Sequence, residues 1–177
     1  MGHSLDALIE FLDRLEARAE LPELVDILND TSVSMQDVHQ FLHFSPVRYT
    51  RNLVRSGEWY NLLVLCWRNG QRSPIHDHLG SSCGMRILQG EAAETTFELA
   101  PNGHVWAVET KFHALGDVLG SQDTDMHQIS NLQADDADLV TLHIYSPPLL
   151  WMGTYSLTDA SRGHEPMFLE FSQSAGI

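Results

Sequence analysis

The sequence predicts a mainly β protein, an antiparallel barrel or sandwich preceded by a few helices. Apolar residues recur at every third or fourth position over residues 1–46, which is the period of a helix. From residue 47 onward the period changes to two, in short runs separated by Gly, Pro, Asn or Asp. Because no helical pattern separates these runs, we expect antiparallel strands rather than βαβ units.

The composition is that of one acidic, folded domain. The 177 residues carry 10 Lys and Arg against 24 Asp and Glu, a formal net charge of −14, and 43% of them are hydrophobic. This length suits a single domain at residues 1–177, with a helical part at 1–46 and a barrel at 47–177. Nucleic acid is not expected as a partner, since its binding depends on clustered Lys and Arg.

Neither the cysteines nor the apolar runs indicate export or a membrane. Cys66 and Cys83 are too few for a disulfide framework and show no CxxC pairing. No apolar run reaches transmembrane length, and the first residues lack the apolar core of a signal peptide. We therefore expect a cytoplasmic protein that does not bind membranes, and we expect it to be a monomer.

Three helices are predicted in the first part of the chain. Ser4 is a candidate N-cap for the first, and Pro22 suits the first turn of the second. Ser34 and Asp37 resemble a capping box that opens a third helix, which Pro46 ends. The apolar faces of these helices consist of Leu5, Leu8, Ile9, Leu12 and Leu15, then Leu24, Val25 and Leu28, then Val38, Phe41 and Leu42. We expect these helices to be structural and to carry no chemistry.

Short runs with a period of two are the predicted strands. They cover residues 49–54, 60–67, 85–88, 94–99, 105–112 and 139–145, with 167–171 as a candidate for one more. Cys66 and Trp67, at the end of the second run, are expected in the core.

His76 and His78 form the most informative local pattern. Side chains at i and i+2 of a strand share a face, so these two imidazoles point the same way and Asp77 points opposite. An isolated HxH is more often a pair of surface or satisfied core histidines than a metal site. A third histidine, His127, lies in a similar turn-and-strand context, and three imidazoles can hold one metal ion. Most of the 24 carboxylates are expected on the solvated surface, as are His104, His113 and His164.

Both histidine stretches resemble the two motifs of the cupin superfamily. Residues that fall on the motifs are Gly70, His76, His78 and Gly90 in the first and Gly116, His127 and Asn131 in the second. Cys83 stands where the first motif has its metal-binding glutamate, and Gln122 and Thr124 replace the proline and glycine of the second. The resemblance implies a cupin fold, a small antiparallel jelly-roll barrel with the helices packed outside.

A narrower resemblance, from about Tyr49 to Pro148, is to the cysteine dioxygenases. It rests on Tyr49-Thr-Arg51-Asn-Leu, Asn61-Leu-Leu-Val-Leu-Cys66-Trp67, Ile75-His76-Asp77-His78, Cys83, Leu88-Gln89-Gly90, His127 and Leu142-His143-Ile-Tyr145-Ser146-Pro147-Pro148. Leu79, Gly80 and Ser82 depart from the Thr, Asp and His expected in mammalian sequences, and the similarity fades after Pro148.

The resemblance implies Fe(II) as cofactor, with His76, His78 and His127 as its ligands. Three neutral imidazoles leave coordination positions open, and without a carboxylate ligand the metal keeps its full charge, which favours a thiolate. The residues alone would equally admit zinc or another metal. The substrate would then be L-cysteine, oxidised with O2.

Arg51 and Tyr49 are the expected substrate-binding residues. They lie two positions apart on a strand, so both face the same side, and a guanidinium there is a forked partner for a carboxylate. For a single arginine, a surface position is the commoner case. In the related mercaptopropionate dioxygenases a glutamine is expected at this place, so Arg51 favours cysteine.

Tyr145, His143 and Cys83 are the expected catalytic residues. Thr141, His143 and Tyr145 alternate along one strand, and the resemblance implies a hydrogen-bonded relay that places the Tyr145 hydroxyl over substrate and dioxygen. Tyr145 would otherwise be a core tyrosine with a satisfied hydroxyl. Eukaryotic family members carry a cysteine that forms a thioether with the matching tyrosine, so a crosslink between Cys83 and Tyr145 is expected.

These expectations combine into one function, an iron-dependent dioxygenase that converts L-cysteine to cysteine sulfinic acid. One alternative is a dioxygenase for another small thiol such as 3-mercaptopropionate. Another is a non-catalytic metal-binding or sensing cupin, which would need neither Arg51 nor the relay.

Overall fold

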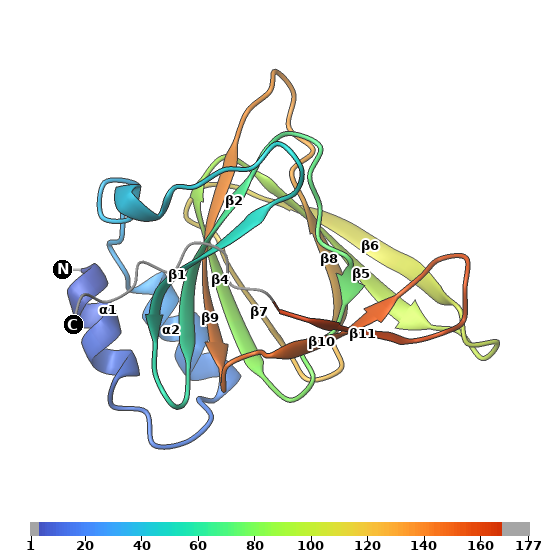
Figure 1. Ribbon diagram of the computed structural model, residues 1–177, viewed down its shortest axis with the longest axis horizontal. Coiled ribbons are helices and arrows are strands. Elements are labelled where there is room, and N and C mark those ends of the chain that lie inside the picture. Colours follow the sequence, from blue (N-terminus) through green and yellow to red (C-terminus); the bar gives the residue numbers. More distant parts are fainter. Residues whose placement is uncertain (1–3, 168–177) are drawn as a thin grey trace.

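The computed structural model describes residues 4–167, which form two facing antiparallel sheets with helices outside (Figure 1). The helical elements are α1 (Leu5–Leu12), α2 (Leu21–Asn29) and the 3₁₀ helix η1 (His39–Phe41). The strands are β1 (Thr50–Ser56), β2 (Asn61–Trp67), β3 (Ile75–His76), β4 (Ser82–Gln89), β5 (Ala92–Leu99), β6 (Val105–His113), β7 (Val118–Gln122), β8 (Met126–Ser130), β9 (Leu139–Ser146), β10 (Trp151–Tyr155) and β11 (Gly163–Pro166).

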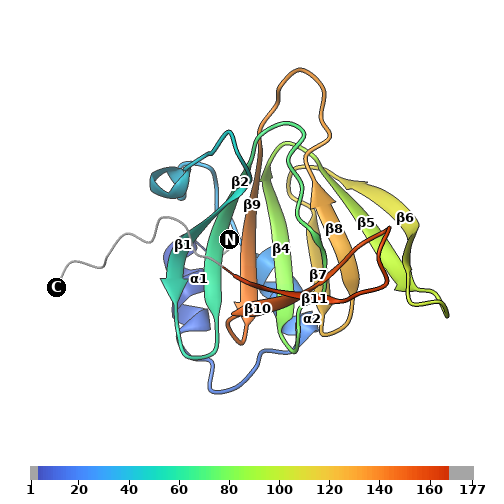
Figure 2. The same cartoon turned by 45° about the vertical axis from the view of Figure 1, so that its right-hand side comes forward.

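The strand order is that of a jelly-roll barrel. Over the described residues one sheet runs β1-β2-β9-β4-β7 and the other β11-β10-β3-β8-β5-β6. Strands distant in the sequence are therefore neighbours, as β2 is of β9 and β3 is of β8. The mainly β architecture with helices outside the barrel confirms the predicted fold class (Figure 2).

The two faces of the first sheet have different neighbours, which explains why β2 and β9 are buried throughout. In β2, Leu62, Val64 and Cys66 pack toward the helices, whereas Leu63, Leu65 and Trp67 pack in the barrel interior. Alternate residues of a strand point to opposite faces, so β9 likewise directs Tyr145 into the interior. The site residues on this sheet thus face the inside of the barrel.

Helices α1 and α2 begin as the sequence predicts. The Ser4 side chain accepts a hydrogen bond from the amide of Ala7, and a proline stands in the first turn of α2. Helix α1 ends at Leu12, short of the predicted Leu15, because the following amides bond three residues back in a tightened turn. Helix α2 lies against β4 and β7, with Leu24 and Leu28 fully buried.

The third predicted helix is wrong as a regular element. Asp37 does accept bonds from the amide and hydroxyl of Ser34, but the segment that follows forms turns and only the short η1. The main-chain carbonyl of His43 accepts hydrogen bonds from the side chains of Thr50 and Asn52 on β1. These bonds hold the segment against β1 in a non-helical conformation. Val38 and Phe41 are nevertheless buried, so the apolar pattern identified core residues correctly.

All predicted strands within the described residues are present, with ends that differ by a few positions. The candidate at 167–171 falls almost entirely outside those residues. Five strands of the described residues lie outside the predicted runs, namely β3, β7, β8, β10 and β11. They are two to five residues long, too short for a periodic pattern to stand out. The expectation that His76 and His78 share a strand was wrong, because β3 ends at His76. Within residues 4–167, no helix is long and apolar enough to cross a membrane.

Candidate active site

Three histidines converge inside the barrel. His76 ends β3, His127 lies opposite it on β8, and His78 follows β3 by two residues. Their ring centroids lie 4.7 to 5.2 Å apart, and one nitrogen from each ring lies within 4.8 Å of the other two. All three side chains are buried. The predicted HxH pair and the third histidine therefore come together as one cluster.

Hydrogen bonds orient two of the rings toward the cluster centre. Nδ1 of His76 lies 3.0 Å from the carbonyl oxygen of Pro74, and Nδ1 of His127 lies 2.8 Å from Oε1 of Glu94. Each ring then has its Nε2 for a ligand. Both nitrogens of His78 are buried and have no hydrogen-bond partner among the described residues. Buried imidazole nitrogens without partners are unfavourable unless they bind something, so the cluster fits a metal ion.

Burial keeps the rings of His76 and His78 neutral. Burial, followed by repulsion from His127, lowers the pKa of His76 to about 3 and that of His78 well below its usual value. A neutral imidazole is the form that ligates a metal, and three nitrogen donors suit a divalent first-row ion.

Glu94, on β5, is a site residue that the sequence interpretation missed. Its side chain is only 15% exposed, and besides bonding His127 it lies 3.3 Å from Nε2 of His113. Burial alone would raise the pKa of Glu94, but the hydrogen bond and charge of His127, together with His113, lower it. Glu94 is thus an exception to the expectation that most carboxylates are solvated, whereas the surface position expected for His113 is wrong, since its side chain is 19% exposed.

Arg51 enters the same pocket from β1. The side chain is 8% exposed, its Nη1 lies 3.4 Å from the hydroxyl of Tyr145, and its guanidinium lies 5.0 Å from the Tyr145 ring centre. Its Nε is buried with no hydrogen-bond partner in the described part of the chain. Tyr49, which precedes β1, stacks on Trp67 with the ring centroids 4.1 Å apart. The guanidinium is thus free to take an anionic ligand inside the pocket.

A chain of hydrogen bonds runs along β9. Nε1 of Trp67 donates to Thr141 Oγ1 at 3.0 Å, Thr141 Oγ1 lies 2.9 Å from Nε2 of His143, and Nδ1 of His143 lies 3.3 Å from the Tyr145 hydroxyl. Burial, and then the Arg51 charge, lower the pKa of His143, so the ring is neutral and carries one proton. With Thr141 donating to Nε2, that proton lies on Nδ1 and points at Tyr145. The Tyr145 hydroxyl hydrogen is then available to a bound molecule.

Cys83, on β4, lies directly opposite Tyr145 on β9 in the antiparallel register. Both side chains are buried and pack in the same interior cluster. Burial raises the pKa of Cys83 to about 12 and also raises that of Tyr145, so thiol and phenol are both protonated at neutral pH. Cys66 faces the helices instead and accepts a hydrogen bond from Asn52 at 3.4 Å.

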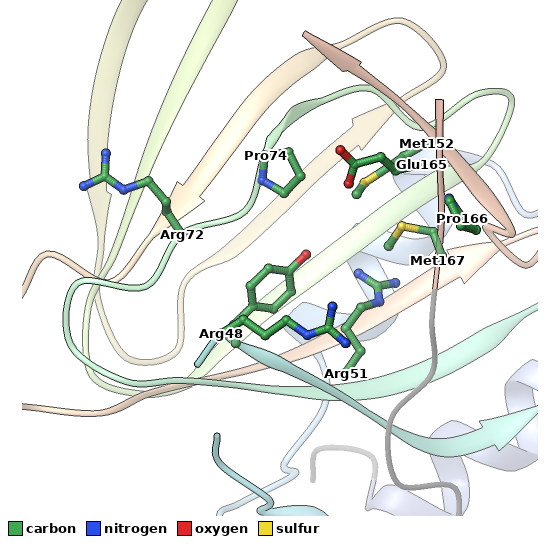
Figure 3. Close-up of a pocket in the computed structure, with 9 residues that line it drawn as sticks. Arg48, Arg51, Arg72, Pro74, Met152, Glu165, Pro166 and Met167 are labelled. Carbon is green, nitrogen blue, oxygen red and sulfur yellow. The ribbon is translucent and has the colours of Figure 1, made fainter. Parts of the chain in front are cut away.

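The histidines lie at the inner end of an opening in the barrel. An inner pocket is lined by the three histidines with Arg51, Cys83, His143, Tyr145 and Trp67 among others, so Trp67 is both a core and a pocket residue. Outside it lies a cavity of about 480 Å³ that shares Tyr49 and Arg51 with the inner pocket (Figure 3). Arg48 and Arg72 line this outer cavity, as do Met152 and Glu165.

The chain is similar to proteins of known activity. It matches the family model "Cysteine dioxygenase type I" over residues 3–158. It is 34% identical to cysteine dioxygenase type 1 of Danio rerio, covering 80% of this chain and 71% of that protein. It is 31% identical to cysteine dioxygenase type 1 of Homo sapiens, covering 98% and 88%.

A solved Klebsiella pneumoniae structure with a double-stranded β-helix domain shares the fold. Its TM-score is 0.53 at 15% identity, covering 62% of this chain and 81% of that one. The family match and the identity to the Danio rerio and Homo sapiens relatives show the family, and the buried histidine cluster agrees with it. The chain belongs to the cysteine dioxygenase type I family.

Proposed function

We propose that this protein is an iron-dependent dioxygenase that oxidises L-cysteine with O2 to cysteine sulfinic acid, adding both oxygen atoms to sulfur. The observation that carries the proposal is the position of Arg51, a buried guanidinium with an unpartnered Nε, in the pocket that holds the three histidines. That pairing of an anion partner with a metal cluster suits a small thiol that bears a carboxylate, in a chain of this family.

His76, His78 and His127 would hold the metal. Fe(II) bound there would supply the redox centre at which the cysteine thiolate and dioxygen react. Burial keeps the rings of His76 and His78 neutral, and hydrogen bonds to Pro74 and Glu94 orient the rings of His76 and His127.

Arg51 and Tyr49 would bind the substrate carboxylate. The guanidinium is held against the face of Tyr145, and Tyr49 is fixed by stacking on Trp67, so both are oriented before substrate arrives. Tyr145, with His143 directing a proton at its oxygen, would donate its hydroxyl hydrogen to the substrate or to oxygen.

A thioether between Cys83 and Tyr145 is part of the proposal. Their opposed positions on β4 and β9 support it. Forming a bond between Sγ and a ring carbon removes one hydrogen from each residue, with dioxygen as the electron acceptor. Intact mass under reducing conditions, measured after turnover, should fall by about two hydrogens. Only unmodified Cys83 and Tyr145 peptides from active, iron-loaded protein would refute the crosslink.

Oxygen uptake combined with metal analysis tests the main proposal. Iron-loaded protein should consume one O2 for each sulfinate formed from cysteine. Sulfinate from 3-mercaptopropionate but none from cysteine would overturn the choice of substrate. Bound iron with no thiol-dependent oxygen uptake would instead indicate the sensing alternative.

Arg51→Ala separates substrate binding from metal binding. Loss of a charge-assisted carboxylate contact should raise KM for cysteine by about tenfold or more while the bound iron stays unchanged. Arg68→Ala is the matched control, because Arg68 pairs with Asp138 at a half-exposed site away from the pocket. Loss of iron from the Arg51 variant would mean that the arginine is structural.

We further propose that the protein acts as a cytoplasmic monomer without nucleic-acid or membrane partners. The two cysteines are buried and free, which suits a reducing compartment, and the net charge of −14 opposes phosphate binding. Light scattering on purified full-length protein should give the monomer mass, near 19.9 kDa. A stable dimer mass would refute the monomer.

A further inference from the structure

Asp77 stands between two of the clustered histidines but points away from them. It is fully buried, and its carboxylate accepts hydrogen bonds from three groups on the neighbouring strand β10 and the loop that follows it. Oδ1 accepts from the amide of Gly153 at 3.0 Å, and Oδ2 accepts from the hydroxyl of Tyr155 at 2.7 Å and from the guanidinium of Arg162. Its own amide donates to the carbonyl of Gly153 at 3.0 Å. These partners all belong to β10 or to the turn after it.

The surroundings are fitted to this carboxylate. A Cβ at Gly153 would lie 2.6 Å from Oδ1 of Asp77, so only glycine admits the close approach. The Arg162 guanidinium lies 5.4 Å from the ring centre of Tyr155. Burial and the bond to Asp77 raise the pKa of Tyr155 to about 12, which keeps the phenol a donor. A buried carboxylate is unfavourable unless it is paired and hydrogen-bonded, and here it is both.

Strands β10 and β11 have few other backbone attachments to the sheet. Strand β11 pairs only with β10 among the described strands, and β10 reaches the rest of the sheet only through the two positions of β3, Ile75 and His76. Met152 packs in the barrel core and Tyr155 packs against Ile75 and its neighbours, and the salt bridge and hydrogen bonds at Asp77 are the main polar side-chain contacts that add to this packing. An edge hairpin with so few neighbours opens easily when such contacts are lost.

The same hairpin forms one wall of the outer cavity. Met152 from β10 and Glu165 and Pro166 from β11 line it, opposite Arg48 and Arg51 (Figure 3). A molecule that reaches Arg51 passes between these walls, because Arg51 lines both the outer cavity and the inner pocket.

We propose that Asp77 and Arg162 form a latch that fixes the β10–β11 hairpin as the outer wall of the substrate entrance. Asp77 is then a positioning residue: the segment that carries two metal ligands on one face anchors the entrance wall on the other. Its kinetic consequence rests on the proposed cysteine dioxygenase function, whereas its structural consequence does not. Releasing the hairpin weakens substrate binding at Arg51 without touching the histidine rings.

Hydrogen exchange on the full-length, iron-loaded protein tests the latch. Arg162→Met leaves the Asp77 carboxylate with two neutral donors, so amides in 151–155 and 163–165 should exchange about tenfold faster or more. KM for cysteine should rise several-fold, with kcat and iron affinity within about twofold of the parent. Arg162→Lys, which keeps the charge, should restore much of the protection.

The matched control is Arg55→Met. Arg55 pairs with Asp13 and is 53% exposed, against 42% for Arg162, and it lies on β1 outside the site. It should change neither hairpin exchange nor KM. Parental exchange in the hairpin of Arg162→Met would overturn the latch, as would faster exchange spread evenly over β2 and β9. A loosened hairpin with unchanged KM would overturn its role at the entrance. A parent protein without cysteine turnover would refute the proposed function, while the exchange data would still decide the latch.

Discussion

Removing the carboxylate of Glu94 is expected to weaken metal binding at the three histidines. Glu94 Oε1 lies 2.8 Å from Nδ1 of His127, and the two side chains are only 15% and 9% exposed. Outer partners of histidine ligands fix the tautomer and raise the basicity of the ring, and their loss costs about 10–100-fold in metal affinity. That range corresponds to about 1.4–2.7 kcal/mol.

Two substitutions separate the contribution of the Glu94 charge from that of its hydrogen bond to His127. Glu94→Gln keeps an oxygen that can accept from His127 but removes the charge, so we expect about a tenfold loss of affinity, and Glu94→Ala should approach about a hundredfold. The assay is an anaerobic Fe(II) titration against a competing chelator, repeated with Zn(II), which needs no turnover. Glu98→Gln, at an exposed position on β5, is the control. Parental affinity in Glu94→Ala would refute the reasoning.

Three further outcomes are expected. Tyr145→Phe should lower kcat for cysteine by about 10–100-fold with iron still bound, measured by sulfinate formation; an unchanged kcat would remove the hydroxyl from the mechanism. Asn131→Ala should lower the free energy of unfolding in urea by about 2 kcal/mol, since the buried amide donates to the carbonyl of Trp67 at 3.0 Å; a loss within error would contradict this. Hydrogen bonds, first from Tyr60 and then from Arg55, lower the pKa of Asp13 below 3.8. Asp13→Asn should therefore have a lower free energy of unfolding than the parent near pH 6, and the difference should shrink as the pH falls below 3.8. A difference in unfolding free energy that stays constant with pH would refute the linkage.

The sequence predicted what regular strands determine. Alternation along a strand was enough to place Thr141 with His143 and Tyr145, because side chains at i and i+2 share a face whatever the strand pairs with. His76 and His78 do lie in one cluster, but β3 ends at His76, so the strand argument used for this pair was wrong. The opposed positions of Cys83 and Tyr145 depend on register, and they were reached only through the family resemblance.

The features that the sequence could not predict depend on strand pairing and on other contacts between distant segments. Glu94 reaches His127 because β5 pairs with β8, with Glu94 opposite Ile129, and nothing local to either strand specifies that register. Strand β3 has two residues, so no periodicity could reveal it. The prediction of a third helix was wrong because interactions with β1 override its local capping signal.

Helix α2 contacts β4 closely at Gly84, the residue next to Cys83. Gly84 faces this helix, and a Cβ there would lie 2.7 Å from Leu28 Cδ1 and 3.3 Å from Leu24 Cβ. Its neighbour Cys83 points the other way, into the pocket. A side chain at Gly84 would therefore force Leu28 into another rotamer and press on Leu24, directly beside Cys83 in the sequence. The described helices carry no residue of the pocket, yet α2 restricts which residue can stand next to Cys83 on β4.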